Sequence, residues 1–301
     1  MQQLLLEESK KEVLCHNVLL LLIVFFQVHP LTHSLIHLLT YLLTYLLTHL
    51  GWSDGTVLAH TAETGESLWF IENAHIGGVT ALCLSHNKRF ILTGGPEGDV
   101  RLWELRSREL ISHLKEHVNR VTALTLFDDD TVAVSASRDR CILQWDLRSE
   151  RRTQCHMQRM GGINSVVISK DESHILSVGQ ERKVVYWNKQ ADQPSYQKYI
   201  DGETGTYLLT HSLTHSLTYS LTYSLELDEG KSIARSNSGK YIAIGGTAGV
   251  IRLLDYSTGE EVASARGHSN TVTKLTFSPD DRQLVSVGLD GCIFIWCIFT
   301  N

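Results

Sequence analysis

The sequence has little proline and methionine, with 4 and 3 residues of each among 301, and it has no excess of positive charge. Its 27 Lys and Arg residues are outnumbered by 33 Asp and Glu, which gives a formal net charge of −6. A chain without a basic stripe has little with which to neutralise phosphates, so no nucleic-acid partner is expected. The apolar content of 43% is ordinary for a globular protein with a sizeable core.

Cysteine is also sparse. The 6 cysteines form no C-x-x-C pair and are too few for a secreted disulfide scaffold. Their number predicts a reducing, cytoplasmic location. Cys141 and Cys292 each follow an aspartate by two residues. They are expected to be small buried hydrophobes of a repeat, and no metal site is predicted.

No targeting or membrane segment is expected at the amino terminus. The apolar run at 18–26 follows a stretch of mixed charge that includes Glu7, Lys10 and Glu12, and no small-residue cleavage site follows it. The run is also too short to cross a bilayer. Membrane association is therefore not predicted.

Signatures of catalysis are missing as well. The sequence contains no G-x-S-x-G elbow, no P-loop and no G-x-G-x-x-G following a strand. We therefore expect no enzyme, no cofactor and no small-molecule substrate.

Two tracts, at 31–49 and 206–225, repeat Thr, His, Tyr, Ser and Leu with a period of four residues. A tetranucleotide repeat in DNA gives this period when it is translated, so His211 and His215 need not be metal ligands. The tracts predict a low-complexity, non-propeller segment at 1–50 and a low-complexity insertion at 206–225.

The rest of the chain repeats every 42 residues. Trp103, Trp145 and Trp187 are spaced by this interval, and each ends a strand-like alternating segment. Leu254 and Trp296 are again 42 apart, and the longer step from Trp187 to Leu254 contains the second tract. This spacing predicts a repeated unit of short strands.

Polar residues recur at fixed offsets from this aromatic position. A histidine lies 28 residues before it, a serine or threonine lies 10 before it and an acid lies 6 before it, while Arg159 replaces the histidine of one unit. The set comprises His75, Thr93, Glu97, Trp103, His117, Ser135, Asp139, Trp145, Ser177, Glu181, Trp187, His268, Ser286, Asp290 and Trp296.

With Gly-His at 267–268 and Trp-Asp at 145–146, this pattern resembles the WD-repeat family. The resemblance covers 51–301 apart from the second tract and implies an all-β propeller, here a partial ring of about five blades. It also implies that the recurring polar residues form a structural hydrogen-bond network inside each blade. Ahead of the first full unit, 54–60 and 65–71 are expected to be the last two strands of an earlier blade.

Ser135, His117 and Asp139 also have the composition of a hydrolase triad. A catalytic set is needed only once, whereas this set recurs, with Thr93 and Glu97 as conservative replacements. The repetition favours the structural interpretation.

The segment 52–105 resembles WD-repeat cilia- and flagella-associated proteins. This resemblance implies a non-enzymatic scaffold of the axoneme that binds tubulin or neighbouring doublet proteins. An alternative comes from residues 134–148, which resemble the Trp-Asp-x-Arg box of substrate receptors of cullin–RING ubiquitin ligases. That resemblance implies docking on an adaptor through Asp146 and Arg148.

Overall fold

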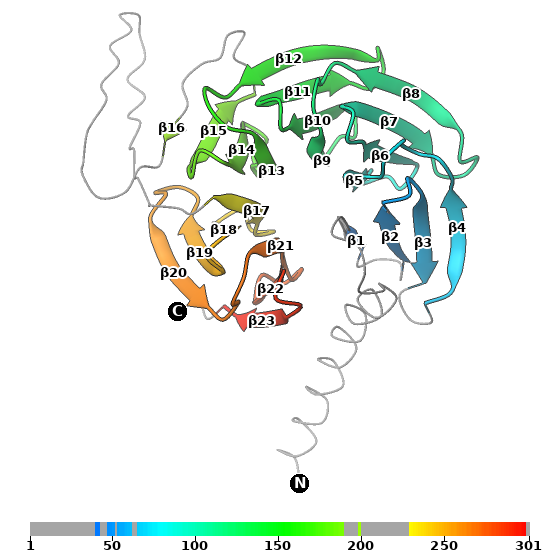
Figure 1. Ribbon diagram of the computed structural model, residues 1–301. Coiled ribbons are helices and arrows are strands. Elements are labelled where there is room, and N and C mark those ends of the chain that lie inside the picture. Colours follow the sequence, from blue (N-terminus) through cyan, green and yellow to red (C-terminus); the bar gives the residue numbers. More distant parts are fainter. Residues whose placement is uncertain are drawn as a thin grey trace, which may run out of the picture.

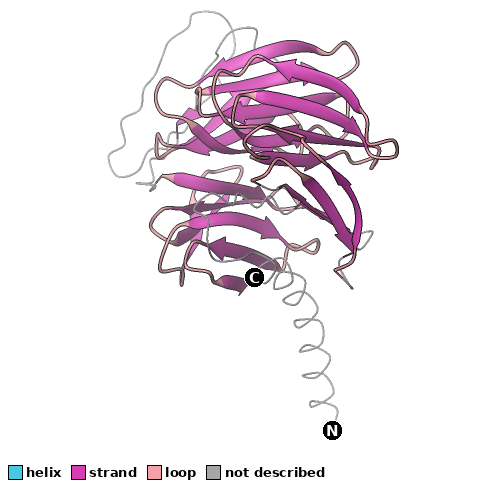
Figure 2. Cartoon of the chain, turned by 45° about the vertical axis from the view of Figure 1, so that its right-hand side comes forward, coloured by secondary structure: helices cyan, strands magenta, loops and turns pink. Residues whose placement is uncertain are grey.

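The computed structural model describes residues 40–42, 47–51, 53–61, 65–189, 198–199 and 229–298. In these ranges the chain is built from strands and the loops that join them (Figure 2). None of the described elements is a helix able to cross a membrane.

The strands form six antiparallel sheets, which we call blades 1 to 6 in chain order. Blades 1 to 5 have four strands each and blade 6 has three. Blade 1 is β1 (Thr40–Leu42), β2 (Leu47–Gly51), β3 (Val57–Thr61) and β4 (Ser67–Ile71); blade 2 is β5 (Ala81–Leu84), β6 (Phe90–Gly94), β7 (Asp99–Glu104) and β8 (Leu110–Lys115). Blade 3 is β9 (Val121–Leu126), β10 (Val132–Ser137), β11 (Cys141–Asp146) and β12 (Arg151–Met157); blade 4 is β13 (Ile163–Ile168), β14 (His174–Gly179), β15 (Val184–Asn188) and β16 (Lys198–Tyr199). Blade 5 is β17 (Gly230–Arg235), β18 (Tyr241–Gly246), β19 (Val250–Asp255) and β20 (Glu261–Arg266); blade 6 is β21 (Val272–Phe277), β22 (Gln283–Gly288) and β23 (Ile293–Cys297).

The blades stand side by side around a centre, with β5, β9, β13, β17 and β21 innermost (Figure 1). The ring is not closed, because blade 6 lies at one end of the arc and blade 1 at the other. The expected all-β propeller with a partial ring is confirmed. Blades 2 to 6 coincide closely with the units that the 42-residue period predicts.

The structure corrects the boundary predicted for the amino-terminal segment. Residues 40–42 pair with 47–51, and 47–51 pair with β3, so part of 1–50 belongs to blade 1. β1 and β2 extend the sheet of β3 and β4 to four strands, and the structure has six sheets where the sequence predicts about five blades. A period of four is a multiple of the strand period of two, so a four-residue repeat keeps one set of side chains on each face of a strand. The tract at 206–225 lies outside the described residues.

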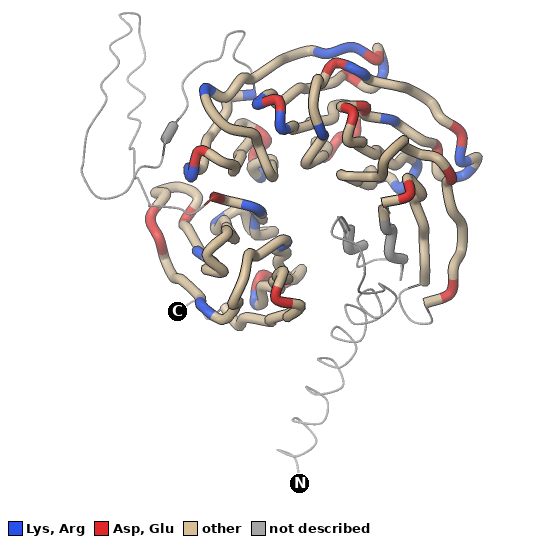
Figure 3. The backbone as a smooth tube through the Cα atoms, viewed as in Figure 1, with Lys and Arg blue, Asp and Glu red and all other residues tan. Residues whose placement is uncertain are grey.

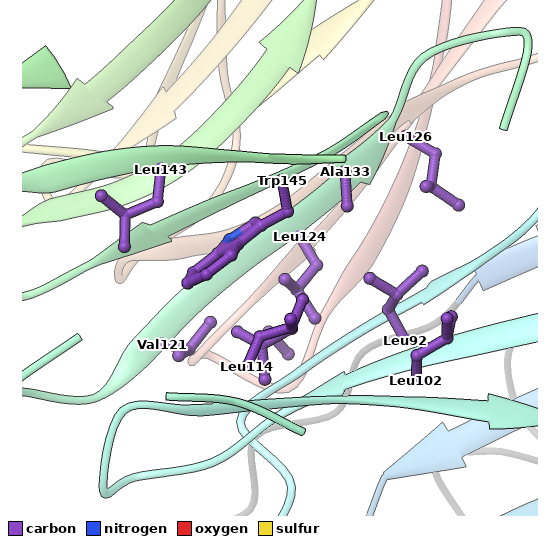
Figure 4. Close-up of a cluster of buried hydrophobic side chains, with 11 residues drawn as sticks. Leu92, Leu102, Leu114, Val121, Leu124, Leu126, Ala133, Leu143 and Trp145 are labelled. Atoms are coloured by element: carbon purple, nitrogen blue, oxygen red, sulfur yellow. The ribbon is translucent and has the colours of Figure 1, made fainter. Parts of the chain in front are cut away.

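Hydrophobic clusters lie between consecutive blades. The cluster between blades 2 and 3 joins Leu92 and Leu102 of the former to Val121, Leu143 and Trp145 of the latter (Figure 4). Four equivalent clusters fill the other interfaces. Apolar residues on both faces of the middle strands are therefore buried, as the segment VAVSAS of β10 illustrates.

Outer strands are half exposed, and their sequences are correspondingly mixed. In β12 most side chains face solvent, and His156 is buried. Charged residues of both signs are distributed around the ring (Figure 3).

The described cysteines are free thiols. Cys141 is half-buried and packs against the cluster between blades 2 and 3. The expectation of burial is wrong for Cys292, which is exposed. Cys292 belongs to blade 6, which has a neighbouring blade on one side only among the described residues.

Candidate functional site

Blade 3 contains the full polar set that the sequence predicts. Ser135 Oγ accepts a hydrogen bond from Trp145 Nε1 at 2.8 Å and lies 2.8 Å from His117 Nε2. The other ring nitrogen of His117 lies 2.8 Å from Asp139 Oδ2. Asp139 also accepts hydrogen bonds from the backbone N–H groups of Val118 and Cys141. The series of hydrogen bonds Trp–Ser–His–Asp therefore connects β11 to β10. It also holds the loop that enters the blade against the turn between β10 and β11.

Electrostatics in this set follow from its hydrogen bonds. Burial opposes the charge of Asp139, but the bond and charge of His117 and the two backbone N–H groups favour it, and together they lower the pKa of the carboxyl. The carboxylate thus holds the imidazole in one orientation.

Blade 6 repeats this arrangement. Ser286 Oγ accepts from Trp296 Nε1 at 2.9 Å and lies 2.8 Å from His268 Nε2. His268 Nδ1 lies 3.0 Å from Asp290 Oδ2, and that carboxylate accepts the N–H of Ser269. The two blades are far apart in sequence, so the repeat generates the same geometry twice.

Blade 2 keeps only the inner half of the set. Thr93 Oγ1 accepts from Trp103 Nε1 at 2.9 Å and lies 2.8 Å from His75 Nε2. Glu97, predicted to complete it, is exposed and makes no hydrogen bond to His75 in the described part of the chain. The turn stays close to the histidine, because a Cβ on Gly95 would lie 2.4 Å from His75 Nδ1, as one on Gly288 would lie 2.5 Å from His268 Nδ1 in blade 6.

Asp99, a residue that the sequence analysis did not select, takes the acidic role elsewhere in blade 2. Its carboxylate lies 3.2 Å from His113 Nε2 and 3.2 Å from Lys115 Nζ. His75 is left without a carboxylate partner, and burial, assisted by the charge of Arg101, lowers its pKa to about 4. The histidine is therefore neutral at neutral pH.

Blade 4 has the hydroxyl and the indole without the histidine. Trp187 Nε1 donates to Ser177 Oγ at 2.8 Å. Glu181 accepts the backbone N–H of Met160 at 2.6 Å, and Arg159 is exposed. The acid keeps its role of binding the loop that enters the blade, even though the imidazole is absent.

Blade 5 replaces the set with apolar residues. Leu254 stands at the tryptophan position and Ile244, ten residues earlier, at the hydroxyl position, and both are buried. Replacing both partners of a buried hydrogen bond with apolar groups is nearly neutral for stability. The fold therefore tolerates complete loss of the set, as it tolerates the partial sets of blades 2 and 4.

Blade 1 departs in a different way. His60, at the tryptophan position, places Nδ1 3.2 Å from the carbonyl oxygen of Gly65. Asp54, at the acidic position, accepts the N–H and the hydroxyl of Thr56 and no imidazole N–H of the described residues. These residues stabilise turns of blade 1 and do not reproduce the set.

Hydrolysis is a poor fit to this geometry. Ser135 and Ser286 have no exposed surface, and each hydroxyl is already shared between an indole and an imidazole. A nucleophile must reach a substrate carbonyl, and no substrate can approach these oxygens without opening the blade. The sets are suited to fixing loops to strands.

A second recurring contact, which the sequence analysis missed, joins neighbouring blades. Asp130 accepts the backbone N–H groups of His86 and Asn87 in the preceding blade, both at 2.8 Å. Glu172 does the same for Asp128, and Asp281 accepts two N–H groups, those of Asn237 and Ser238. The only signal in the sequence is an acid that recurs at the same place in the turn after the innermost strand.

The proposed adaptor-docking pair lies in the turn after β11. Arg148 is exposed, and its backbone N–H donates to Asp146 Oδ1 at 2.9 Å. Asp255 of blade 5 accepts the N–H of Ser257 in the same way. The role of Asp146 within its own turn is thus common to two blades.

Comparison with known proteins agrees with this architecture. The family model described as "WD domain, G-beta repeat" matches residues 66–104, 108–146 and 259–297. The chain is a WD40-repeat protein. Each match begins at or near an outer strand and ends with the last residue of the tryptophan strand of the next blade, so it covers most of one 42-residue unit.

Several curated proteins are similar to this WD40-repeat chain. Cilia- and flagella-associated protein 52 of Bos taurus is 30% identical over 252 residues, which is 81% of this chain and 36% of that protein. The Homo sapiens protein of the same name is 39% identical over 67 residues, 22% of this chain and 11% of its own length. Protein ROOT INITIATION DEFECTIVE 3 of Arabidopsis thaliana is 41% identical over 68 residues, 23% and 16% of the two chains. The matched regions cover 36%, 11% and 16% of the lengths of these three relatives.

Proposed function

We propose that this chain is a non-enzymatic scaffold of the axoneme of motile cilia or flagella and that it binds tubulin or doublet proteins. The observation that carries the proposal is the similarity over 81% of the chain to a protein named for cilia and flagella. The WD40 repeats support the scaffold role, because propellers present rigid loops to other proteins.

The blade geometry supports a role without catalysis. Its histidine, hydroxyl and acid groups are buried in contacts that hold loops on strands, as in blade 3. The described residues also contain no group of three or more His, Cys, Asp or Glu placed to hold a metal ion.

The alternative, an adaptor-docking substrate receptor, depends on Asp146 and Arg148. Exposure of Arg148 is compatible with docking. The same turn contacts around Asp255 favour an ordinary structural role.

Co-purification from ciliated cells separates the two functions. The tagged chain and its Arg148→Ala variant would be expressed in parallel, and bound proteins identified by mass spectrometry. We expect tubulin or doublet proteins with both forms, because Arg148 plays no part in the proposed function. Recovery of a cullin and its adaptor with the parent chain, and their loss with the variant, would establish the alternative.

A further inference from the structure

The loops on one side of blades 3 and 4 carry arginine beside exposed apolar side chains. The apolar residues are Val118 and Met160, with 88% and 72% of their surfaces exposed. Each directly follows the histidine position of its repeat, so the two lie at equivalent places in neighbouring blades. Ile76 occupies the same place in blade 2 and is 77% exposed. An apolar row thus extends along one face of the arc.

Hydrogen bonds connect these loops into one surface. Val118 N–H donates to Asp139, whose neighbour Arg140 donates from Nη1 to the carbonyl oxygen of Arg159 at 3.3 Å. Met160 N–H donates to Glu181, the neighbour of Arg182. The loops entering blades 3 and 4 and the turns after β10 and β14 are therefore contiguous.

The cations on this surface are poorly compensated. In the described part of the chain, no acid forms an ion pair with Arg120, Arg140, Arg159 or Arg182. Burial and the adjacent charge of Arg138 lower the pKa of Arg120, so two guanidinium groups of like charge are near each other. Of the acids close by, Asp139 and Glu181 are occupied by hydrogen bonds within their blades, and Glu229 pairs with Lys231 and lies 3.8 Å from Arg138.

We propose that this surface, formed by Val118, Met160, Arg120, Arg140, Arg159 and Arg182, is a docking site for an acidic protein segment that carries apolar side chains. Carboxylates of the segment pair with the guanidinium groups, whose planar donors suit them, and its apolar side chains cover Val118 and Met160. The charge complementarity selects an acidic partner even though the whole chain is itself acidic. The proposal deepens the scaffold role by naming the chemistry of the partner, and it does not require the axonemal location.

Turn geometry supplies variants that keep the fold. Arg140 and Arg182 have left-handed backbones, with φ of 75° and 57°. Glycine, which favours this conformation, stands at the equivalent place in blades 2, 5 and 6 as Gly98, Gly249 and Gly291. The double variant Arg140→Gly/Arg182→Gly therefore removes two cations without opposing the turn. Arg108→Gly is a matched control, because Arg108 is an exposed arginine with φ of 62° in the turn between β7 and β8, on the opposite side of the arc.

The test is fluorescence anisotropy with a labelled peptide of repeated Glu-Glu-Leu units, at low and at physiological salt. We expect the parent chain and Arg108→Gly to bind the peptide with the same affinity. The double variant should bind it at least about fivefold more weakly. Met160→Ser should also weaken it, because the apolar contact is lost. Peptides with Lys for Glu, or Ser for Leu, should bind less well.

Four results would overturn the proposal. They are no binding of the Glu-Glu-Leu peptide, equal binding by the double variant and the parent, equal binding of the Lys peptide, and tighter binding of an oligothymidylate, which would identify a nucleic-acid surface. Repeating the axonemal co-purification with the double variant separates this proposal from the proposed function. Axonemal proteins recovered without peptide binding would overturn only the surface, and peptide binding without axonemal proteins would overturn only the proposed location.

Discussion

Replacement of Asp139 with alanine should destabilise blade 3 by about 1 to 3 kcal/mol. The carboxylate accepts three donors, which are His117 Nδ1 and the N–H groups of Val118 and Cys141. Water can replace it at the backbone groups near the surface. The imidazole of His117 has no exposed surface, so its donor would be left unpaired in the interior.

The free energy of unfolding would be measured by denaturant titration followed by tryptophan fluorescence, with a parallel thermal melt. In a protein of this size each kcal/mol corresponds to about 2 to 4 °C in Tm. Arg148→Ala is the control, because this exposed side chain has no contact that the blade requires, and it should change stability by less than about 0.5 kcal/mol.

A double variant, His117→Leu/Asp139→Ala, sharpens the test. If the cost of Asp139→Ala comes from the unpaired imidazole, removing the imidazole as well should cost less than the two single changes added together. Blade 5, with Ile244 and Leu254 in place of the hydroxyl and indole, shows that a blade folds without the set. Strictly additive costs, or a larger loss from Arg148→Ala than from Asp139→Ala, would refute this reasoning.

The pKa of His75 is 6.5 in the unfolded chain and about 4 in the folded chain. Between these pH values the unfolded chain binds a proton that the folded chain excludes, so protonation favours unfolding. The free energy of unfolding should therefore be unaffected by this group above pH 6.5 and should decrease by up to about 3 kcal/mol as the pH falls toward 4. Denaturant titrations across this range should show a flatter pH dependence for His75→Gln than for the parent, and equal slopes would contradict it. Asp130→Ala should cost about 0.5 to 1.5 kcal/mol by releasing the turn of blade 2, whereas Asp129→Ala, which caps Thr131 in its own turn, should cost less in the same titration. Deletion of 206–225 should raise soluble yield and thermal midpoint, because the tract is rich in Leu and Tyr without a charged residue; a less stable deletion form would show that the tract packs into the fold.

The sequence predicts the middle of this fold well because one period governs strand pairing and side-chain burial together. Trp103, Trp145 and Trp187 mark equivalent strands, and the blades around them follow the 42-residue unit. The same counting identifies the complete polar sets of blades 3 and 6, because each offset corresponds to one place in the blade.

Other features could not be obtained by counting. Glu97 has the correct offset, but its side chain is exposed and makes no hydrogen bond to His75 among the described residues. The origin of a tract in a DNA repeat does not exclude strand pairing, so β1 and β2 form within a segment that the sequence assigns to no blade. Asp130 and Glu172 act on the preceding blade, and a pattern within one repeat does not reveal a contact between two repeats.

The chain forms consecutive blades whose inner strands pack against one another. Hydrogen exchange of the intact chain, followed by mass spectrometry, tests it most directly. We expect the slowest exchange in the inner and middle strands of blades 2 to 5, such as β9, β10 and β11, and faster exchange in the outer strands β8, β12 and β20. Uniformly fast exchange, or protection confined to the outer strands, would contradict the propeller arrangement.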